Sequence, residues 1–380
     1  MVLPKRPLKF FFGIILFCLS VNFGRSEKQN DFSGTAGWSE IEITPPLGIA
    51  LGGRGAPSTT AKKILDPLFG QVLFLKDAKG TGFVLVSLDL VGMSHKLSDE
   101  IRLALVHELG VEWNLTVLNC SHTHSGPYMI RDLMAGVAPA PEIEIEYFKA
   151  LKEKIILAAR AAAQEMSPVK VEVFEGRSQV AINRRGKNKM GAVAMLPNPN
   201  GPMAEKVWVM KLTPQNKKPA ALIFSYACHP VIVYGYAIAG ISADFPGVTR
   251  TVLREKIGAQ IHVQFVQGLA GDVRPRALAD LKNNRFRTAT PEDLQSAGTQ
   301  LANDILAALK NKSEILSLNL AGAGDRPFLR RGQPPPKEIY EKMKAEAVAK
   351  TNQFHLAVSE FWLKNYTAQK GFAKGDPWPT

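Results

Sequence analysis

Three of the seven histidines follow two apolar segments of the chain. His122 and His124 stand in Asn119-Cys-Ser-His-Thr-His-Ser-Gly-Pro127, directly after an apolar run, and His229 stands in Tyr226-Ala-Cys-His-Pro230 after another. Residues i and i+2 of an extended segment point to the same side, so the first two imidazoles can approach one point. Zinc prefers imidazole nitrogen and lowers the pKa of a bound water. This convergence favours a metal site over exposed or packed histidines.

Four further polar residues follow apolar runs or lie in glycine-rich turns. Asp89 ends one run and could fix the orientation of an imidazole. Asp244 could cap the helix after it or orient a ligand histidine, and Asp272 has either a structural turn role or a place in the site. Arg184 lies in an Asn-Arg turn, where it could offer a cation to a carbonyl or an oxyanion, or simply be a solvated surface arginine.

The elements that must position these residues alternate along the chain. Predicted strands cover residues 71–75, 83–90, 115–120, 169–174, 207–212, 220–228 and 261–266, and predicted helices cover 98–110, 142–166, 246–257 and 290–310. Strands that alternate with helices, some of them in adjacent pairs, predict an α/β fold with a mixed β-sheet core covered by helices. Residues 27–40 are polar and are expected to form a flexible arm.

The N-terminus has the order of a secretory signal peptide. A basic start (residues 5–9) precedes an almost wholly apolar run (residues 10–21), and small residues follow up to Ser26. The run is shorter than the roughly 20 residues of a membrane-spanning helix. We therefore expect residues 1–26 to be a cleaved signal, with a retained anchor as the alternative, and the protein to be secreted or periplasmic.

The charge of the chain bears on its partners. The chain carries a net charge of +13, and residues 1–26 hold four of its basic residues and none of its acids, which leaves +9. The basic residues are scattered and form no stripe interleaved with aromatics, so nucleic acid is not an expected partner. A preference for anionic substrates is expected, and contact with a membrane surface is compatible with this charge.

Two cysteines remain outside the predicted signal, and both stand beside histidines. Cys120 and Cys228 each end an apolar run, and two cysteines do not define a disulfide framework. We expect them to be buried free thiols. An alternative chemistry would use Ser125 or Cys228 as a nucleophile next to histidine.

Taken in order, the motifs resemble those of the neutral/alkaline, non-lysosomal ceramidases. The matching pieces are Ile43-Thr-Pro-Pro-Leu-Gly48, Val86-Ser-Leu-Asp89, His122-Thr-His-Ser-Gly-Pro127, Ile182-Asn-Arg184, Ala227-Cys-His-Pro230, Ile241-Ser-Ala-Asp244 and Gly271-Asp-Val-Arg-Pro275. The resemblance implies a ceramidase-like catalytic domain over residues 37–325, a zinc amidase with its metal at the base of a pocket over a mixed sheet. Residues 326–380 are proline-rich and then form an amphipathic helix near 337–365, and we expect an incomplete C-terminal part there.

The resemblance also implies roles for individual residues. His122 and His229 would be zinc ligands, and His124 and Arg184 would contact the substrate or the tetrahedral intermediate. Asp272 and Arg274 would lie in the same catalytic site. The implied reaction is the attack of a zinc-activated water on the amide carbonyl of an N-acyl lipid, which releases a fatty acid and would place the protein in sphingolipid metabolism.

Two departures from the family pattern bear on whether the chain is a hydrolase or a binding protein. Arg274 stands where the family has an essential serine, so a hydroxyl is replaced by a permanent cation that suits an anionic or polyhydroxylated substrate. The family completes its zinc site with a glutamate and a tyrosine from beyond the point matching Thr380, and Asp89 or Asp244 could substitute. We expect an exported zinc-dependent hydrolase of an amide or related bond; the alternative is a catalytically inactive binding protein on the same scaffold.

Overall fold

The computed structural model describes residues 32–53, 59–131, 139–216, 219–324, 335–351, 353–364 and 366. The predicted signal peptide, residues 1–26, lies outside the described residues, as does most of the proline-rich stretch after residue 324. Among the helices described, none combines the length and the apolar character that crossing a membrane requires.

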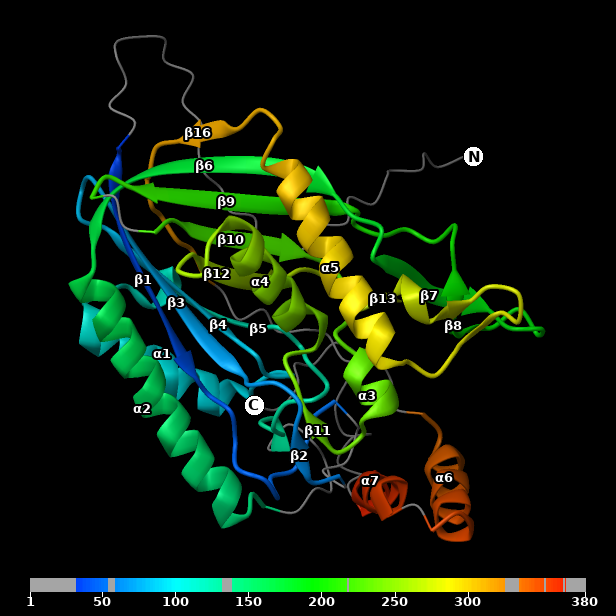
Figure 1. Ribbon diagram of the computed structural model, residues 1–380. Helices are drawn as coiled ribbons and strands as arrows, with labels where there is room; N and C mark the ends of the chain where they lie inside the picture. Colours follow the sequence, from blue (N-terminus) through cyan, green and yellow to red (C-terminus); the bar gives the residue numbers. More distant parts are fainter. Residues whose placement is uncertain are drawn as a thin grey trace, which may run out of the picture.

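A large mixed sheet forms the centre of the molecule (Figure 1). Its strands run in the order β12-β10-β9-β6-β1-β3-β4-β5, with β16 paired to β6. Their bounds are β1 Gly34–Glu42, β3 Phe69–Asp77, β4 Gly82–Leu88, β5 Thr116–Cys120, β6 Ser167–Arg177, β9 Lys206–Pro214, β10 Ala221–Tyr226, β12 His262–Gln267 and β16 Glu314–Leu316. The pairs β4–β5 and β10–β12 are parallel and the others are antiparallel, which confirms the predicted mixed sheet.

Helices cover the two halves of this sheet on their outer faces. Helices α1 (His95–Leu109) and α2 (Glu142–Gln164) lie over the half that contains β1, β3 and β4, and α4 (Asp244–Ile257) and α5 (Pro291–Ala308) lie over the half that contains β9, β10 and β12 (Figure 1). Side chains of a strand alternate between its two faces, so each half also has an inner face. Apolar residues of the two inner faces form a third core. The sheet is therefore folded over on itself.

The edge strands β5 and β12 meet where the sheet folds. Asn119 of β5 donates from Nδ2 to the Gln267 carbonyl of β12 at 3.3 Å and accepts from the Gln267 backbone N–H at 2.9 Å. Gln264 of β12 donates from Nε2 to the Leu85 carbonyl at 3.3 Å and to Ser87 Oγ at 3.0 Å. These contacts bring the carboxyl end of β5 beside those of β10 and β12, and the candidate histidines follow β5 and β10.

Part of the predicted flexible arm is a strand inside the sheet. Residues 34–42 form β1, which lies between β6 and β3, so the prediction for residues 27–40 is wrong over its described C-terminal part. Ala36 is fully buried among the inner faces. Gly37 passes close beneath α2, because a Cβ there would lie 1.9 Å from the Ala162 carbonyl oxygen. The segment is polar in overall composition. Successive residues of a strand point to opposite faces of the sheet, so single small residues of this segment can still be buried.

The helix ends agree with the sequence in part. Helix α1 begins at His95 instead of residue 98, because Ser94 Oγ accepts a hydrogen bond from the Leu97 backbone N–H at 3.3 Å. It ends as predicted at Gly110, which adopts the left-handed conformation with φ 64°. The segment near 337–365 is not one helix but two, α6 (Lys337–Ala349) and α7 (Gln353–Lys364), with Thr351 at φ 51° between them.

A buried histidine of the sheet should make the stability of the fold pH-dependent. Burial lowers the pKa of His262 to about 4, and the hydrogen bond with Gln264 and the charges of Glu40, Arg254 and Arg250 act more weakly. Because the pKa in the unfolded chain is about 6.5, the unfolded chain binds the proton first as the pH falls. The resulting stability is present above about pH 6.5 and is lost progressively toward pH 4.

We expect His262→Gln to remove this pH dependence, because glutamine does not titrate. Between pH 7 and pH 5 the free energy of unfolding of the wild type should fall by about 2 kcal/mol more than that of the variant. Urea unfolding of both proteins at the two pH values measures the difference. Parallel pH profiles would contradict the assignment.

Candidate metal centre

The three candidate histidines lie together at the rim of the sheet. One nitrogen of each ring lies within 4.8 Å of one nitrogen of each of the others. The ring centroids are 4.5 Å apart for His122 and His229 and 5.1 Å apart for His124 and each of these two. His229 is buried and the other two are half-buried. Residues more than a hundred positions apart in the sequence thus form one group of imidazoles.

The hydrogen bonds of two of these rings fit a metal ion. His122 Nδ1 lies 2.6 Å from the Val91 carbonyl oxygen, and His229 Nδ1 lies 3.0 Å from the Ala270 carbonyl oxygen. A carbonyl only accepts, so each Nδ1 carries the proton and each Nε2 keeps its lone pair. Metal-bound histidines in proteins are held by this kind of contact. The donor set therefore suits a cation that prefers imidazole.

The loop after β5 is fixed in place by backbone contacts. His122 has φ 67°, a left-handed conformation that is uncommon for a residue with a side chain. Its N–H donates to the Leu90 carbonyl at 2.9 Å, and the His124 N–H donates to the Pro230 carbonyl at 3.1 Å. Thr123 Oγ1 donates to the Ser242 carbonyl at 2.8 Å. The loop holds an unfavourable conformation because two segments bind its backbone and a third binds the Thr123 hydroxyl, and strained backbone of this kind clusters at functional sites.

The electrostatics of the centre keep the imidazoles of His122 and His229 neutral. Burial, together with the nearby His122, Arg184 and Arg274, lowers the pKa of His229 to about 4, although the hydrogen bond with the Ala270 carbonyl acts in the opposite direction. Burial also lowers the pKa of His122, and the Arg184 guanidinium acts in the same direction. A neutral imidazole has the lone pair that a metal requires, so protons compete little for these nitrogens at neutral pH.

The Asn-Arg and Gly-Asp motifs lie on adjacent strands of a small second sheet. Strand β7 (Ala181–Lys187) pairs with β13 (Val273–Pro275) on one side and β8 (Val193–Asn198) on the other. Arg184 donates from Nε and Nη2 to the Gly271 carbonyl at 3.2 and 2.8 Å, and its N–H donates to the Asp272 carbonyl at 2.7 Å. Arg274 lies opposite Ile182. The loop before β13 also carries the Ala270 carbonyl that holds His229.

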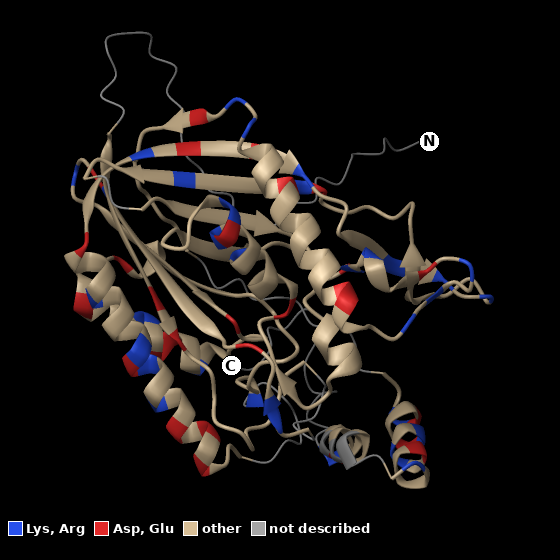
Figure 2. Cartoon of the chain, viewed as in Figure 1, with Lys and Arg blue, Asp and Glu red and all other residues tan. Residues whose placement is uncertain are grey.

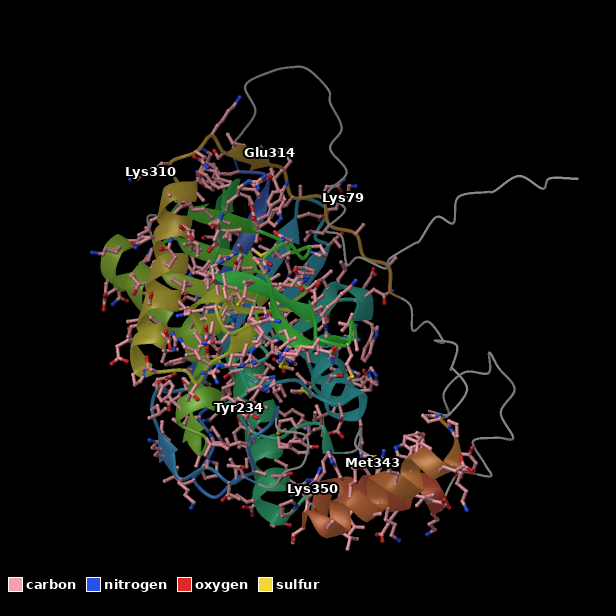
Figure 3. The ribbon with its side chains drawn as sticks, turned by 90° about the vertical axis from the view of Figure 1, so that its right-hand side faces the viewer. Lys79, Tyr234, Lys310, Glu314, Met343 and Lys350 are labelled. Atoms are coloured by element: carbon pink, nitrogen blue, oxygen red, sulfur yellow. The ribbon has the colours of Figure 1, made fainter. Side chains whose placement is uncertain are left out.

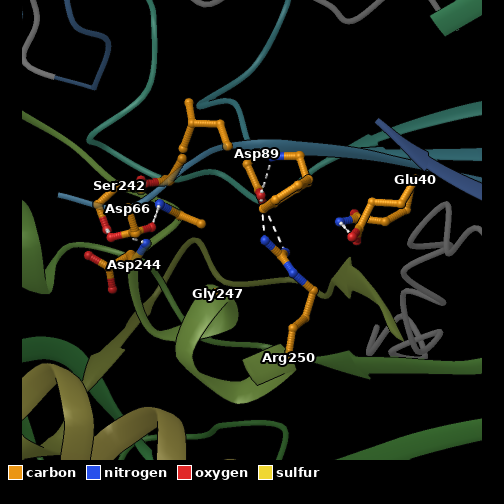
Figure 4. A network of polar contacts seen from close by, with 12 residues as sticks. Glu40, Asp66, Asp89, Ser242, Asp244, Gly247 and Arg250 are labelled. Carbon is orange, nitrogen blue, oxygen red and sulfur yellow. Dashed lines mark hydrogen bonds and ion pairs between the residues drawn. The ribbon is translucent and has the colours of Figure 1, made fainter. Parts of the chain in front are cut away.

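Asp89 and Asp244, which could have oriented a ligand histidine or replaced a missing metal ligand, have other partners. Asp89 forms a buried ion pair with Arg250 and accepts from the Phe69 N–H at 2.9 Å, so it does not orient an imidazole (Figure 4). Asp244 accepts from the Val233 and Phe245 backbone N–H groups, both at 2.8 Å, and so holds the first turns of α3 (Ile232–Tyr236) and α4. The group of possible ligands in the described chain includes neither carboxylate.

The thiol and hydroxyl groups considered as nucleophiles are poorly placed for that role. Burial raises the pKa of the Cys228 thiol well above its usual value and that of Cys120 to about 12. Both cysteines are free thiols as expected, although Cys120 is half-buried instead of buried. Ser125 is fully buried, and its hydroxyl makes no hydrogen bond to any described residue. A thiolate is disfavoured here, and the hydroxyl lacks a general base.

One aromatic residue of the site was not singled out in the sequence. Tyr234 of α3 lies edge-on to His124, with 5.9 Å between ring centroids. Figure 3 shows Tyr234 on the lower part of the molecule, away from Lys310 and Glu314 at its top. Its position five residues after His229 was the available signal.

A glycine beside the centre leaves room for a histidine ring. A Cβ on Gly53 would lie 2.3 Å from His124 Cγ, and Gly53 has φ 75°. We expect Gly53→Ala to lower the free energy of unfolding by about 1–3 kcal/mol more than Gly80→Ala, because a clash is added to the backbone cost. Gly80 has φ 86° and open space around the Cβ position, so it isolates the backbone cost. Urea unfolding measures both, and equal losses would contradict a clash with His124.

Comparison with known proteins identifies the fold. No protein-family model and no curated protein matches the chain by sequence. The crystal structure of neutral ceramidase from Pseudomonas aeruginosa superposes with a TM-score of 0.61 at 17% identity, over 74% of this chain and 45% of that one. A structure of ceramidase complexed with C2 gives 0.58 at 16% identity, over 73% and 44%. The chain spans less than half the length of these ceramidases, and it has a ceramidase-like fold.

Proposed function

We propose that this chain is an exported, zinc-dependent hydrolase of an amide bond in an N-acyl substrate. The observation that carries the proposal is the group of three imidazoles, two with Nδ1 held by backbone carbonyls, on a ceramidase-like fold. The expectation of export rests on the signal-like residues 1–26.

Each residue of the site has a role in this proposal. His122 and His229 bind zinc, which lowers the pKa of a bound water and polarises a carbonyl. His124, the third imidazole, contacts the carbonyl oxygen of the substrate. Arg184 places a cation beside the charge that develops on that oxygen. Burial lowers the pKa of Arg184, and the Asp272 carboxylate opposes that shift. Asp272 also supports Arg184 because its backbone carbonyl accepts from the Arg184 N–H.

Exposed apolar side chains near the site favour an amphiphilic substrate. Leu269, next to the residue that holds His229, is 81% exposed. On the β7–β8 hairpin, Met190, Val193 and Met195 are 87%, 65% and 52% exposed. Leu269 adjoins the residue that holds His229, and Met195 contacts Arg274, so a lipid or acyl ligand is favoured; the basic residues of the same hairpin support contact with a membrane surface.

The test is metal analysis combined with hydrolysis of N-acyl amides by the purified protein. About one zinc per chain and chelator-sensitive release of fatty acid are expected. Failure to bind zinc, also in a protein extended beyond Thr380, would reject the proposal. Export is tested separately by the N-terminal sequence of the protein recovered outside the cytoplasm, which should begin near residue 27.

A second candidate function is a binding protein without catalysis. Arg274 in place of the family's serine favours it, because no hydroxyl remains at that position. His122→Ala separates the two functions: an enzyme loses turnover, whereas a binding protein keeps its affinity for the N-acyl ligand.

A further inference from the structure

Arg274 is a half-buried cation whose guanidinium has few partners in the described part of the protein. Its Nε is buried and has no hydrogen-bond partner among the described residues. Its guanidinium carbon lies 4.8 Å from the centroid of the Phe286 ring, and Nη1 lies 3.5 Å from Met195 Sδ, a weak acceptor. In the described part of the chain no carboxylate forms an ion pair with it. Burial of a guanidinium is costly when its donors are not satisfied.

The charges around Arg274 do not compensate its own. Arg184 and Arg185 both donate from Nη2 to the Gly271 carbonyl, at 2.8 and 3.2 Å, so two more guanidiniums stand at the same loop. Among the described residues of this loop the carboxylate is that of Asp272, which accepts a weak 3.4 Å bond from Asn183 Nδ2. Three guanidiniums and one carboxylate leave a net charge of +2. Lys and Arg predominate along the β7–β8 hairpin as well (Figure 2).

This basic group adjoins the histidine centre. Arg274 lies four residues after Ala270, whose carbonyl holds His229; burial lowers the pKa of Arg274, and Tyr234 and Cys228 lie close enough to act against that shift. Tyr234 in turn contacts the ring of His124. An anion bound by Arg274 would therefore lie beside a molecule bound at the histidines.

We propose that Arg274 forms an anion subsite, so that the preferred substrate carries a carboxylate or sulfonate close to the amide bond that is cleaved. This rests on the proposed hydrolase function. In the reaction, water adds across the C–N bond: the acyl carbon gains the hydroxyl group and the amine nitrogen gains the proton. Arg274 takes no part in that transfer. It binds the anionic group through charge-assisted hydrogen bonds from Nη2, the guanidinium nitrogen that is neither buried nor bonded to a described residue.

The test compares two substrates that differ in one charge. N-dodecanoylglycine carries a carboxylate next to its amide, and N-dodecanoylglycinamide replaces it with a neutral carboxamide; N-dodecanoyltaurine adds a sulfonate. For the zinc-loaded wild type we expect kcat/KM for the two anions to exceed that for the neutral amide by about 10- to 100-fold. This ratio should fall as NaCl is added, because salt screens the charge. A ratio near one in the wild type overturns the proposal.

Variants then assign the preference to Arg274. In Arg274→Met, which keeps an apolar stem against Phe286, the ratio of anionic to neutral kcat/KM should fall toward one through a higher KM for the anions. Arg274→Lys should be intermediate, since it keeps the charge but loses the planar fork. Arg177→Met removes an exposed charge elsewhere and should keep the wild-type ratio. An unchanged ratio in a folded Arg274→Met would refute the assignment.

Binding separates this inference from the hydrolase proposal. If neither amide is cleaved, the hydrolase function fails, and calorimetric titration with N-dodecanoylglycine still tests the subsite. We expect about 10-fold weaker binding by Arg274→Met than by the wild type. Equal affinities, or no binding to the zinc-loaded wild type, would refute the subsite.

Discussion

Replacing His229 with alanine is expected to lower the zinc affinity of the protein by more than about 100-fold, because loss of a ligand should exceed the 10- to 100-fold cost of losing an outer-shell partner. His229 is buried, its Nδ1 is held by Ala270, and its ring lies 4.5 Å from that of His122. The carboxylates of Asp89 and Asp244 cannot take the place of this imidazole as a ligand, since both bind other partners. Competition with a chromophoric chelator measures the affinity.

The three histidines should give different results in the same assay. In our proposal His122→Ala loses zinc as His229→Ala does, whereas His124→Ala keeps zinc binding but loses turnover. If His124→Ala also loses zinc, all three imidazoles are ligands and its proposed contact with the substrate is wrong. His107→Ala is the matched control, because His107 is exposed on α1, and it should change neither quantity. Full zinc binding by His229→Ala would contradict the metal centre itself.

Much of the arrangement of the site could be predicted because apolar runs end at polar motifs. In the sequence, helix α1 connects β4 to β5 and helix α4 lies between β10 and β12. The two strands of each pair are parallel, so their carboxyl ends lie at the same edge of the sheet. The sequence alone therefore predicts that His122 and His229 lie at strand ends, since each follows an apolar strand. The approach of the two ends to each other also required the fold-over of the sheet, which depends on the Asn119–Gln267 contacts 148 residues apart. Side-chain type alone carries no signal for that pairing.

What could not be predicted rests on backbone groups and distant partners. The carbonyls that hold the imidazoles belong to Val91 and Ala270, and any residue offers a carbonyl, so neither sequence position stands out. Asp89 was interpreted as an orienting partner because it ends an apolar strand. Its actual partner, Arg250, lies on a helix 161 residues away and reads in the sequence as an ordinary charged residue of that helix.

Replacing Asp89 with asparagine is expected to destabilise the fold by about 3–5 kcal/mol, because it leaves a buried cation without its counter-ion. The side chains of Arg250 and Asp89 are 3% and 2% exposed, and both carboxylate oxygens accept from the guanidinium (Figure 4). Asparagine keeps an oxygen that accepts from the Phe69 N–H, so the decrease in the free energy of unfolding reflects the loss of the negative charge. Urea unfolding at pH 7 measures it.

Two further variants test that reasoning. Asp89→Asn combined with Arg250→Met should recover most of the stability, since a buried ion pair is often replaceable by neutral groups of similar size whereas half of one is not. Glu108→Gln breaks the exposed pair with Arg160 and should have little effect. If the double variant is as unstable as the single one, the shape of the site and not the unpaired charge sets the cost.

The same substitution should weaken the metal centre through the strand end that carries Asp89. The carbonyl groups of Leu88 and Leu90 accept from the N–H groups of Ser121 and His122, and the Val91 carbonyl holds the imidazole of His122. Residues 88–91 thus hold both the backbone and the ring of one proposed ligand. Zinc affinity should fall in Asp89→Asn and return in the double variant. If the double variant recovers stability but not zinc affinity, the charge of Arg250 is not what disturbs His122, and the ion pair positions this ligand directly.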